Sequence, residues 1–207
     1  MKIGVLGTGM VGDAIASKLV ALGHEVMMGS RDAHNAKATA WVKRVGARAK
    51  KGTFADTASF GEVLFNCTRG ANSLEVLGAV GQERLAGKIL IDIANILQPE
   101  LRRAESLGEQ IQATFPKAKV VKALNTMNCS LMVDPAKLSE SHTVFMSGND
   151  GSAKKTSREL LAAFGWKDII DLGDITTARA LESYLALWLG LWKALGTAQF
   201  NIKVVRS

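Results

Sequence analysis

The sequence predicts an α/β fold, a doubly wound and mostly parallel sheet, with a small C-terminal α/β extension that ends in a long apolar helix. Three observations predict it. Short apolar strands alternate with helical stretches over residues 1–124, a glycine-rich turn joins the first strand to the first helix, and the last helix is apolar over most of its surface. Alternating strands and helices are typical of parallel sheets with helices on both faces.

The N-terminal segment is predicted to form one strand, helix and strand unit. Lys2–Leu6 is a short apolar run that predicts a strand, and the glycine-rich turn Gly7–Gly12 follows it directly. The next stretch repeats apolar residues, Ile15 among them, at helical spacing, and Gly23 ends it. A second strand is then expected over His24–Met28.

The remaining elements continue the alternation. Helices are expected at about Ala33–Val45, Ser73–Val80 and Leu101–Phe115, and strands at Val63–Phe65, Lys88–Ile91 and Lys119–Val121. The pattern changes at residue 125, so we expect one domain over residues 1–124 and a C-terminal extension over residues 125–207. The extension is expected to hold strands at Thr143–Met146 and Asp168–Asp171 and helices at Ser152–Phe164 and Thr176–Leu195.

The last helix is apolar on more of its surface than one core contact requires. Leu181, Tyr184, Leu185, Trp188, Leu191, Trp192 and Leu195 recur at spacings of three and four residues, and Leu187 and Leu189 widen that stripe. We interpret one side as packing on the sheet and the other as a contact between subunits. A homodimer through this helix is therefore expected.

Composition excludes several classes of protein. The chain is 47% hydrophobic and 22% charged, which is typical of a globular domain. Its longest stretch without a charged residue, Ala123–Val133, is much shorter than the roughly twenty apolar residues of a membrane-spanning helix. Two cysteines and three histidines are too few and too scattered for a disulfide framework or a metal site. We therefore expect no metal, no membrane partner and a reducing, cytoplasmic setting.

The net charge is +7, from 26 basic and 19 acidic residues, and favours anionic ligands such as nucleotides or nucleic acid. Basic residues gather at Lys37, Lys43, Arg44, Arg48, Lys50 and Lys51. This run lacks any recognised element that reads nucleic acid. We interpret it as a solvated helix face and expect no nucleic-acid partner.

The turn after the first strand carries the pattern Gly-x-Gly-x-x-Gly between a strand and a helix, which is the context of the Rossmann dinucleotide fingerprint. The first glycine permits the tight turn, the second lets the backbone approach the pyrophosphate, and the third allows close helix packing. The helix N-terminus presents free N–H groups to the anion. The expected cofactor-binding residues here are Gly7, Thr8, Gly9, Met10, Val11 and Gly12; the alternative is that the glycines merely end the strand.

The end of the second strand indicates which dinucleotide binds. Enzymes that use NAD place Asp or Glu there for the ribose 2′-hydroxyl, whereas this chain has Gly29, Ser30 and Arg31. Ser30 can donate a hydrogen bond and Arg31 a charge-assisted fork to a 2′-phosphate, which is worth about 1.5–3 kcal/mol. The negative charge of Asp32 would disfavour a 2′-phosphate unless this residue caps the next helix. Arg31 could instead be a solvated loop residue. The pattern favours NADP(H).

Residues just after each parallel strand are pocket candidates, because ligands bind beyond the carboxyl ends of such strands. They are Cys67, Thr68 and Arg69 after one strand, Asn95 after the next, and Asn125 and Met127 after the one that follows. The two asparagines can offer a donor and an acceptor to the nicotinamide carboxamide, or they can serve turns and caps. Cys67 has no histidine beside it, so we interpret it as a packing residue.

The sequence contains no nucleophile triad, no paired carboxylates and no metal-ligand spacing, so no catalytic acid or base is identified. Hydride transfer to a conjugated ring needs mainly orientation, and Asn95, Asn125 and Met127 are the candidates for that pocket. One alternative is a small carbonyl or imine reductase, for which Lys122 or Tyr184 would have to supply a proton. Another is a redox sensor that binds NADPH without turnover.

Several motifs stand in a familiar order: Gly7–Gly12, Gly29–Asp32, Lys122–Asn128, Val144–Asn149, and Thr177–Arg179 through Lys203–Val205. Together they resemble the NADP oxidoreductase, coenzyme F420-dependent family, and more closely its bacterial dinucleotide-binding paralogues. The resemblance implies an oxidoreductase that binds NADPH through Thr8–Gly12, Ser30, Arg31 and Cys67–Arg69. It also implies a homodimer and a small-molecule hydride acceptor, a deazaflavin (coenzyme F420) or a flavin, between the sheet and the C-terminal helix.

The chain differs from this family pattern near the expected acceptor. Relatives often have Pro-Trp where this chain has Arg69 and Gly70, and they tend to have proline at Ile96. The segment Ile96–Glu105 is also shorter. These differences fall in the expected acceptor pocket and not in the residues expected to bind the nucleotide.

Overall fold

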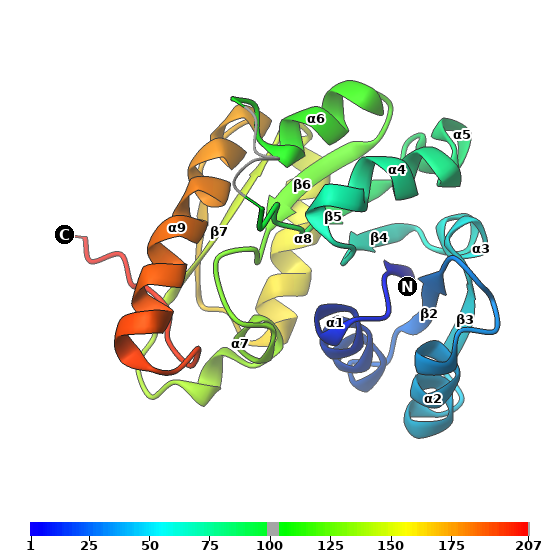
Figure 1. The fold of residues 1–207 in the computed structure, drawn as a ribbon, viewed down its shortest axis with the longest axis horizontal. Coiled ribbons are helices and arrows are strands. Elements are labelled where there is room, and N and C mark those ends of the chain that lie inside the picture. Colours follow the sequence, from blue (N-terminus) through cyan, green and yellow to red (C-terminus); the bar gives the residue numbers. More distant parts are fainter. Residues whose placement is uncertain (99–103, 207) are drawn as a thin grey trace.

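The computed structural model, which describes residues 1–98 and 104–206, contains one eight-stranded sheet in the order β3-β2-β1-β4-β5-β6-β7-β8 (Figure 1). The strands are β1 (Lys2–Leu6), β2 (Glu25–Ser30), β3 (Ala49–Thr53), β4 (Val63–Asn66), β5 (Ile89–Asp92), β6 (Lys119–Ala123), β7 (Thr143–Gly148) and β8 (Asp168–Asp171). Neighbouring strands are parallel except β6 and β7. This arrangement confirms the predicted doubly wound, mostly parallel sheet.

Helices cover both faces of the sheet. They are α1 (Met10–Ala21), α2 (Ala36–Val45), α3 (Phe54–Phe60), α4 (Gly70–Val80), α5 (Gln82–Leu85), α6 (Leu107–Thr114), α7 (Cys129–Val133), α8 (Gly151–Phe164) and α9 (Ala178–Leu195), with short 3-10 turns at Pro135–Lys137 and Ile175–Thr177. One buried apolar cluster holds Ile15, Trp41 and Phe164 from α1, α2 and α8. A second holds Leu77 and Ile111 from α4 and α6. Each cluster packs on one face, as a layered α/β domain requires.

The chain after residue 124 continues the same sheet instead of forming a separate layer. β7 pairs with β6 in antiparallel orientation and β8 then pairs with β7 in parallel, the two being joined by α8. The expected boundary at residues 124 and 125 lies between β6 and α7. The extension therefore brings α7 and α9 to the side of the sheet where the strands from β1 to β6 end (Figure 1).

β3 and α3 were not predicted from the sequence, and the interpretation of the basic run as a helix face was partly wrong. Lys50 and Lys51 lie on β3 and not on a helix face. The Lys50 ammonium is 3.0 Å from Glu25 Oε2, and Lys51 donates to the carbonyl of Ala33 at 2.7 Å. β3 is an edge strand, and charged side chains suit an edge because they discourage pairing with other chains.

Two helices begin later than the sequence suggested. Asn35 caps α2 by accepting hydrogen bonds from the backbone N–H groups of Lys37 and Ala38, at 3.0 and 3.1 Å. The proposed capping role of Asp32 is therefore wrong; its carboxylate accepts from the His34 N–H at 2.8 Å. The helix expected from Leu101 begins instead at Leu107, after Ser106 as its cap; residues 101–103 of that expectation lie outside the described part.

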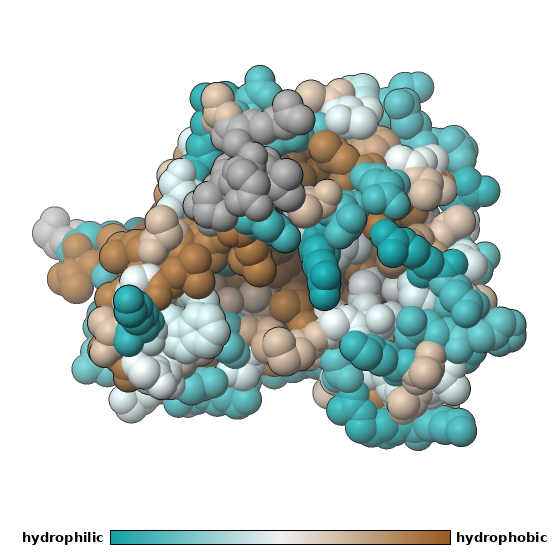
Figure 2. Space-filling view, viewed as in Figure 1, coloured by the Kyte–Doolittle hydropathy of each residue, from teal (hydrophilic) through white to brown (hydrophobic). Residues whose placement is uncertain are grey.

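The last helix, α9, divides into a buried and an exposed apolar side. Leu181 and Leu185 are buried, whereas Leu187, Trp192 and Leu195 are 57%, 47% and 56% exposed. Figure 2 shows hydrophobic residues gathered over the α9 region and the C-terminal tail. Within residues 1–98 and 104–206, no helix is both long and apolar enough to cross a membrane.

Candidate functional site

The glycine-rich turn lies at the point where the order of the strands reverses. β1 is followed in the sheet by β2 on one side and β4 on the other, which is the switch point where such sheets bind ligands. Gly7 has φ +125°, and a Cβ there would lie 2.6 Å from the Cys67 carbonyl oxygen. A Cβ on Gly12 would lie 2.1 Å from the Gly7 carbonyl oxygen. The packing of the turn therefore requires glycine at both positions, whether or not a ligand binds.

Gly9 has a different environment. A Cβ there would meet no atom within 4 Å, and its φ of −80° and ψ of −176° suit any residue. Gly9 precedes α1, and no side chain of the described residues caps that helix. The first N–H groups of α1 are thus left for an anion, and the space beside Gly9 is where a pyrophosphate would approach. The cradle fits a dinucleotide.

Ser30 and Arg31 stand at the end of β2, as the sequence predicts. The Ser30 side chain is buried and donates to the Asp32 carbonyl at 2.5 Å. The Arg31 side chain is 70% exposed, with Nη2 3.5 Å from Glu75 Oε1. A pair this exposed contributes little stability, so Arg31 is available to turn toward an anionic ligand.

A cleft of about 440 Å³ opens beside the glycine-rich turn. It is lined by Gly9, Met10, Val11, Cys67, Thr68, Arg69, Ile93, Ala94, Asn95, Leu97, Asn125, Met127, Asn128, Cys129, Met132, Leu185 and Trp188. The structure therefore brings together most of the predicted site residues, from the ends of four strands. Among the others, Thr8 lines an adjoining cavity, and Gly7, Gly12, Ser30 and Arg31 lie outside the lining of the cleft. Figure 2 shows the hollow with hydrophobic residues on its floor.

The two predicted asparagines bind each other across the cleft wall. Asn125 Nδ2 donates to Asn95 Oδ1 at 3.0 Å and to the Leu181 carbonyl at 3.1 Å, while Asn95 Nδ2 donates to the Asn125 carbonyl at 2.7 Å. These bonds tie the loops after β5 and β6 to α9. In the described chain, Asn125 Oδ1 is buried without a hydrogen-bond partner. A buried acceptor of this kind favours a ligand donor nearby.

A buried charge cluster, which was not predicted from the sequence, lies beside this pair. The Lys122 ammonium is 2.8 Å from Asp92 Oδ2 and 2.9 Å from Glu182 Oε1, and it also donates to the Ala94 carbonyl. The side chains of Lys122 and Asp92 are fully buried. Burial by itself lowers the pKa of Lys122, but Asp92 and Glu182 outweigh it and hold that pKa above its usual value. Lys122 therefore stays charged.

The cluster fixes the loop that carries Asn95. Asp92 Oδ1 accepts from the Ala94 N–H at 3.3 Å, so both polar groups of the Ala94 backbone are held. Glu182 accepts from the N–H groups of Leu107 and Gly108, at 2.8 and 3.1 Å, at the start of α6. The cluster thereby joins β5, β6, α6 and α9 around one end of the cleft.

The neighbouring pair of Arg179 and Glu109 makes stability depend on pH. Arg179 donates two hydrogen bonds of 2.6 and 2.7 Å to Glu109, and this pairing, helped by Ser106, lowers the pKa of Glu109 from 4.5 to about 2. A carboxylate whose pKa is lowered by folding stabilises the protein above its unfolded pKa, and that contribution disappears as the pH falls.

We expect Glu109→Gln to reduce the loss of thermal stability between about pH 4.5 and about pH 2, because glutamine does not titrate. Unfolding temperatures of both proteins across this range measure the effect. Identical pH profiles for wild type and variant would contradict the assignment.

The candidate proton donors do not reach the cleft. Lys122 is fully buried among its acceptors, and neither Lys122 nor Tyr184 is part of the cleft lining. The Tyr184 hydroxyl is buried without a partner among the described residues, and this burial raises its pKa. Cys67 is a free thiol whose pKa is raised by burial, which argues against a nucleophile. No group of three metal-ligating side chains occurs among residues 1–98 and 104–206.

A glycine-rich turn at a sheet switch point, joined to an apolar cleft, defines a dinucleotide-binding protein. The model of the NADP oxidoreductase, coenzyme F420-dependent family matches residues 2–96. A crystal structure from Arthrobacter sp. FB24, assigned as an F420-dependent NADP-reductase, is 50% identical with a TM-score of 0.93, and the match covers 100% of both chains. The chain therefore belongs to the coenzyme F420-dependent NADP oxidoreductase family, which confirms the predicted family and its cofactor NADP(H).

More distant relatives fit this assignment. The F420-dependent NADP reductase of Methanothermobacter marburgensis is 29% identical over 208 residues, with 92% of each chain covered. The rat metalloreductase STEAP3 is 32% identical over 195 residues, which make up 93% of this chain but only 38% of that protein. An imine reductase from Aspergillus terreus has a TM-score of 0.67 at 20% identity, over 94% of this chain and 62% of that one. That last likeness concerns the fold alone.

Proposed function

We propose that the protein transfers hydride from NADPH to a flat ring acceptor of the deazaflavin or flavin type. One observation carries the proposal: the apolar cleft opens directly from the glycine-rich turn, and its described lining holds no His, Lys, Tyr, Asp or Glu that could donate a proton to a substrate. A conjugated ring accepts hydride at one atom and takes its proton from solvent at another, so the protein need only align the two rings. A carbonyl or imine substrate would need a donor at the reacting atom.

Several of the predicted residues have a definite role in this proposal. The N–H groups after Gly9 hold the pyrophosphate, and Arg31 holds the 2′-phosphate. Ser30 joins Arg31 once its hydroxyl turns from the Asp32 carbonyl to the phosphate. The Asn95 and Asn125 pair faces the nicotinamide carboxamide, with Asn125 Oδ1 as acceptor. Met127 and the other apolar side chains exclude water from the ring contact.

The relatives support both kinds of ring. The reductase from Methanothermobacter marburgensis is F420-dependent by name, which favours a deazaflavin. The STEAP3 relative is a metalloreductase, and reduction of a metal ion takes single electrons, which a flavin can release after accepting a hydride. The match covers only 38% of STEAP3, so its reduction of metal is not carried over to this chain.

An acceptor panel tests the proposed function. NADPH oxidation is followed by stopped flow, without oxygen, in the presence of F420, FMN, FAD or riboflavin. We expect reduction of at least one ring with equal amounts of NADPH consumed and acceptor reduced. Binding of NADPH without turnover by any of them would favour the redox sensor instead.

Arg31→Ala is expected to weaken NADPH binding by roughly tenfold to a hundredfold while leaving NADH within about twofold, because only NADPH carries the 2′-phosphate. Calorimetric titration with both dinucleotides measures the difference. Arg48→Ala, which removes an exposed arginine of the basic run at the opposite end of β2 and β3, is the matched control. Equal weakening of NADPH and NADH by Arg31→Ala would refute the role.

We also propose a homodimer through the exposed side of α9. Leu187, Trp192 and Leu195 form an apolar surface, and such patches mark association sites. Light scattering after size exclusion should give a dimer for the wild type and a monomer for Leu195→Glu. Leu22→Glu, a charge at another exposed leucine, should leave the dimer intact. A monomeric wild type would end this proposal.

Both cysteines are free thiols that line the cleft. An oxidising environment would modify such thiols or cross-link them. We therefore place the activity in the reducing cytoplasm.

A further inference from the structure

A ring of hydrogen bonds lies behind the loop that follows β4. The Asn66 amide nitrogen donates to Asp92 Oδ1 at 2.7 Å and to the Ser73 hydroxyl at 3.0 Å. Asn66 Oδ1 accepts from the Thr68 hydroxyl at 2.7 Å and from the Thr68 N–H at 3.3 Å. The side chains of Asn66, Ser73 and Asp92 are fully buried, whereas Thr68 lines the cleft. The ring therefore joins the interior of the sheet to the surface of the cleft.

The orientation of the Asn66 amide is fixed from both ends. The Asp92 carboxylate accepts hydrogen bonds, and the backbone N–H of Thr68 can only donate. The NH₂ group must therefore face Asp92, and the amide oxygen must face Thr68. A flipped amide would place acceptor against acceptor at one end and donor against donor at the other.

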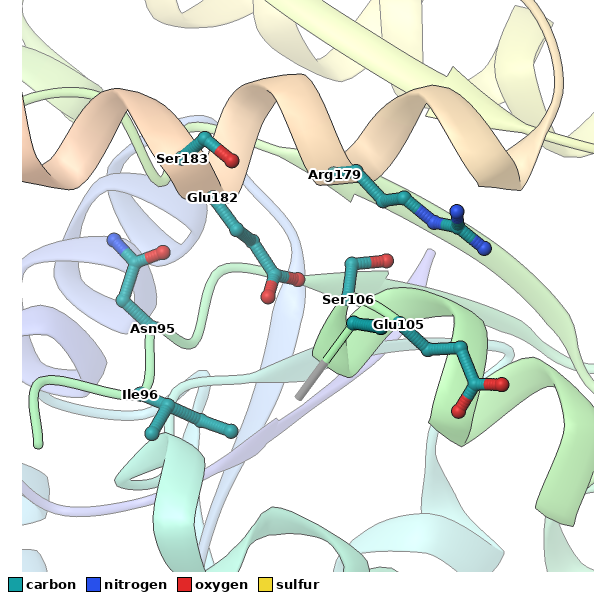
Figure 3. Close-up of a pocket in the computed structure, with 8 residues that line it drawn as sticks. Asn95, Ile96, Glu105, Ser106, Arg179, Glu182 and Ser183 are labelled. Carbon is teal, nitrogen blue, oxygen red and sulfur yellow. The ribbon is translucent and has the colours of Figure 1, made fainter. Parts of the chain in front are cut away.

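The buried charge cluster stands behind this orientation. The Lys122 ammonium is 2.8 Å from Asp92 Oδ2, the oxygen opposite the one to which Asn66 donates. Lys122 also pairs with Glu182, whose carboxylate projects from α9 between Asn95 and the start of α6 (Figure 3). A continuous chain of polar contacts thus runs from α9 through the cluster to Asn66.

These contacts leave the Thr68 hydroxyl as an acceptor toward the cleft. Its single proton goes to Asn66 Oδ1, which can only accept. Ser73 is then the donor in the 2.8 Å contact between the Ser73 and Thr68 hydroxyls. Among the described residues, one lone pair of Thr68 Oγ1 is left for a ligand. That ligand atom must donate, so a hydroxyl suits it and a phosphate oxygen does not.

Thr68 lies between the two parts of the site that are assigned to the cofactor. A Cβ on Gly7, in the glycine-rich turn, would lie 3.4 Å from the Thr68 nitrogen. At the other end of the loop, a Cβ on Gly70 would lie 2.4 Å from the Asn95 carbonyl oxygen. The loop thus spans the distance from the pyrophosphate to the carboxamide. The ribose of the nicotinamide half joins these two groups, and its hydroxyls can donate.

We propose that Asn66 is a positioning residue for the cofactor, because it holds Thr68 as the acceptor for a hydroxyl of the ribose on the nicotinamide side. A ribose held at this point places the attached nicotinamide ring in the cleft. The inference rests on the placement of the cofactor in the proposed function and does not depend on which ring accepts the hydride.

Two ligands test the contact at Thr68. NADP⁺ carries the nicotinamide ribose, whereas adenosine 2′,5′-bisphosphate carries only the adenosine half with its phosphates. By calorimetric titration, Thr68→Val should weaken NADP⁺ about fivefold and leave the bisphosphate within about twofold. Thr68→Ser keeps the hydroxyl and should retain the wild-type ratio of the two affinities. The matched control is Thr39→Val, which removes the hydroxyl of a part-buried threonine on α2 outside the cleft lining.

Asn66→Ala and Asn66→Asp separate positioning from structural support. Asn66→Asp still offers Thr68 an oxygen, so the affinity ratio should stay within about twofold, although a second carboxylate beside Asp92 lowers the unfolding temperature. Asn66→Ala removes the acceptor and should lower the ratio about fivefold. Adding Thr68→Val to Asn66→Ala should lower it no further, because both changes remove the same contact.

The outcomes separate this inference from the proposed function. Equal weakening of both ligands by Thr68→Val, or additive losses in the double variant, would overturn the role of Asn66. So would a lower ratio in a folded Asn66→Asp protein, since that is the result of structural support alone. If Asn66→Asp does not fold, the double variant decides. If the binding pattern appears and no ring is reduced, the proposed function fails and the positioning role stands.

Discussion

Gly9→Ala is expected to weaken NADPH binding by about a hundredfold or more without destabilising the fold. The added Cβ meets no protein atom within 4 Å, and the backbone of Gly9 has dihedral angles open to alanine. Replacing glycine at a compatible site stabilises proteins by about 0.4–1 kcal/mol. The methyl group would occupy the approach of the pyrophosphate, where two or more charge-assisted bonds of about 1.5–3 kcal/mol each would be lost.

Calorimetric titration with NADPH measures the loss of affinity, and thermal unfolding measures the stability of the variant. Gly78→Ala provides the matched control, because a Cβ on this exposed residue of α4 also meets nothing within 4 Å. It should leave NADPH binding unchanged. Normal binding of NADPH by Gly9→Ala would mean that the dinucleotide does not lie against this turn.

Lys122→Met is expected to destabilise the protein by about 3–5 kcal/mol, because it leaves the buried carboxylates of Asp92 and Glu182 without their cation. For a chain of this length that loss lowers the unfolding temperature by roughly 6–20 °C. The Ala94 carbonyl also loses its donor, so the loop with Asn95 loosens. Turnover should therefore fall in the protein that remains folded.

A variant that lacks all three buried charges identifies the cause of this destabilisation. The triple variant with Asp92→Asn, Lys122→Met and Glu182→Gln removes all three charges and should recover much of the stability, since uncompensated carboxylates are the main cost. Urea unfolding of wild type, single and triple variants gives the comparison. A loss below about 1 kcal/mol in Lys122→Met would contradict the account of the cluster.

The sequence predicted the sheet well where apolar strands alternate with helices, and it missed β3 for a physical reason. Ala49–Thr53 carries two lysines and a glycine and has no apolar run. An edge strand needs to bury only part of its surface, so its pattern resembles a solvated loop. The start of α2 was misplaced because Asp32 and Asn35 are both good caps, and only the local turn decides between them.

The site residues that directly follow parallel strands could be predicted from the sequence. Most of the candidates after β1, β4, β5 and β6 meet in one cleft, because parallel strands end at the same edge. The charge cluster was missed because its partners come from distant segments. A usable signal existed: Asp92 and Lys122 are charged residues that each lie within an apolar run, and they are paired in register on adjacent strands. Glu182 could not be added without knowing how α9 packs.

Transfer of deuterium from NADPH that carries deuterium at both hydrogen positions of nicotinamide C4 tests the central claim most directly. The labelled cofactor is mixed with a deazaflavin or flavin acceptor without oxygen, and the reduced ring is analysed by mass spectrometry. For a deazaflavin, whose accepting atom is carbon, we expect the label to be retained on the reduced ring; for either ring, oxidation should be slowed by the isotope. Reduced deazaflavin that carries no label, or labelled NADPH that binds and is never oxidised, would contradict direct hydride transfer in this cleft.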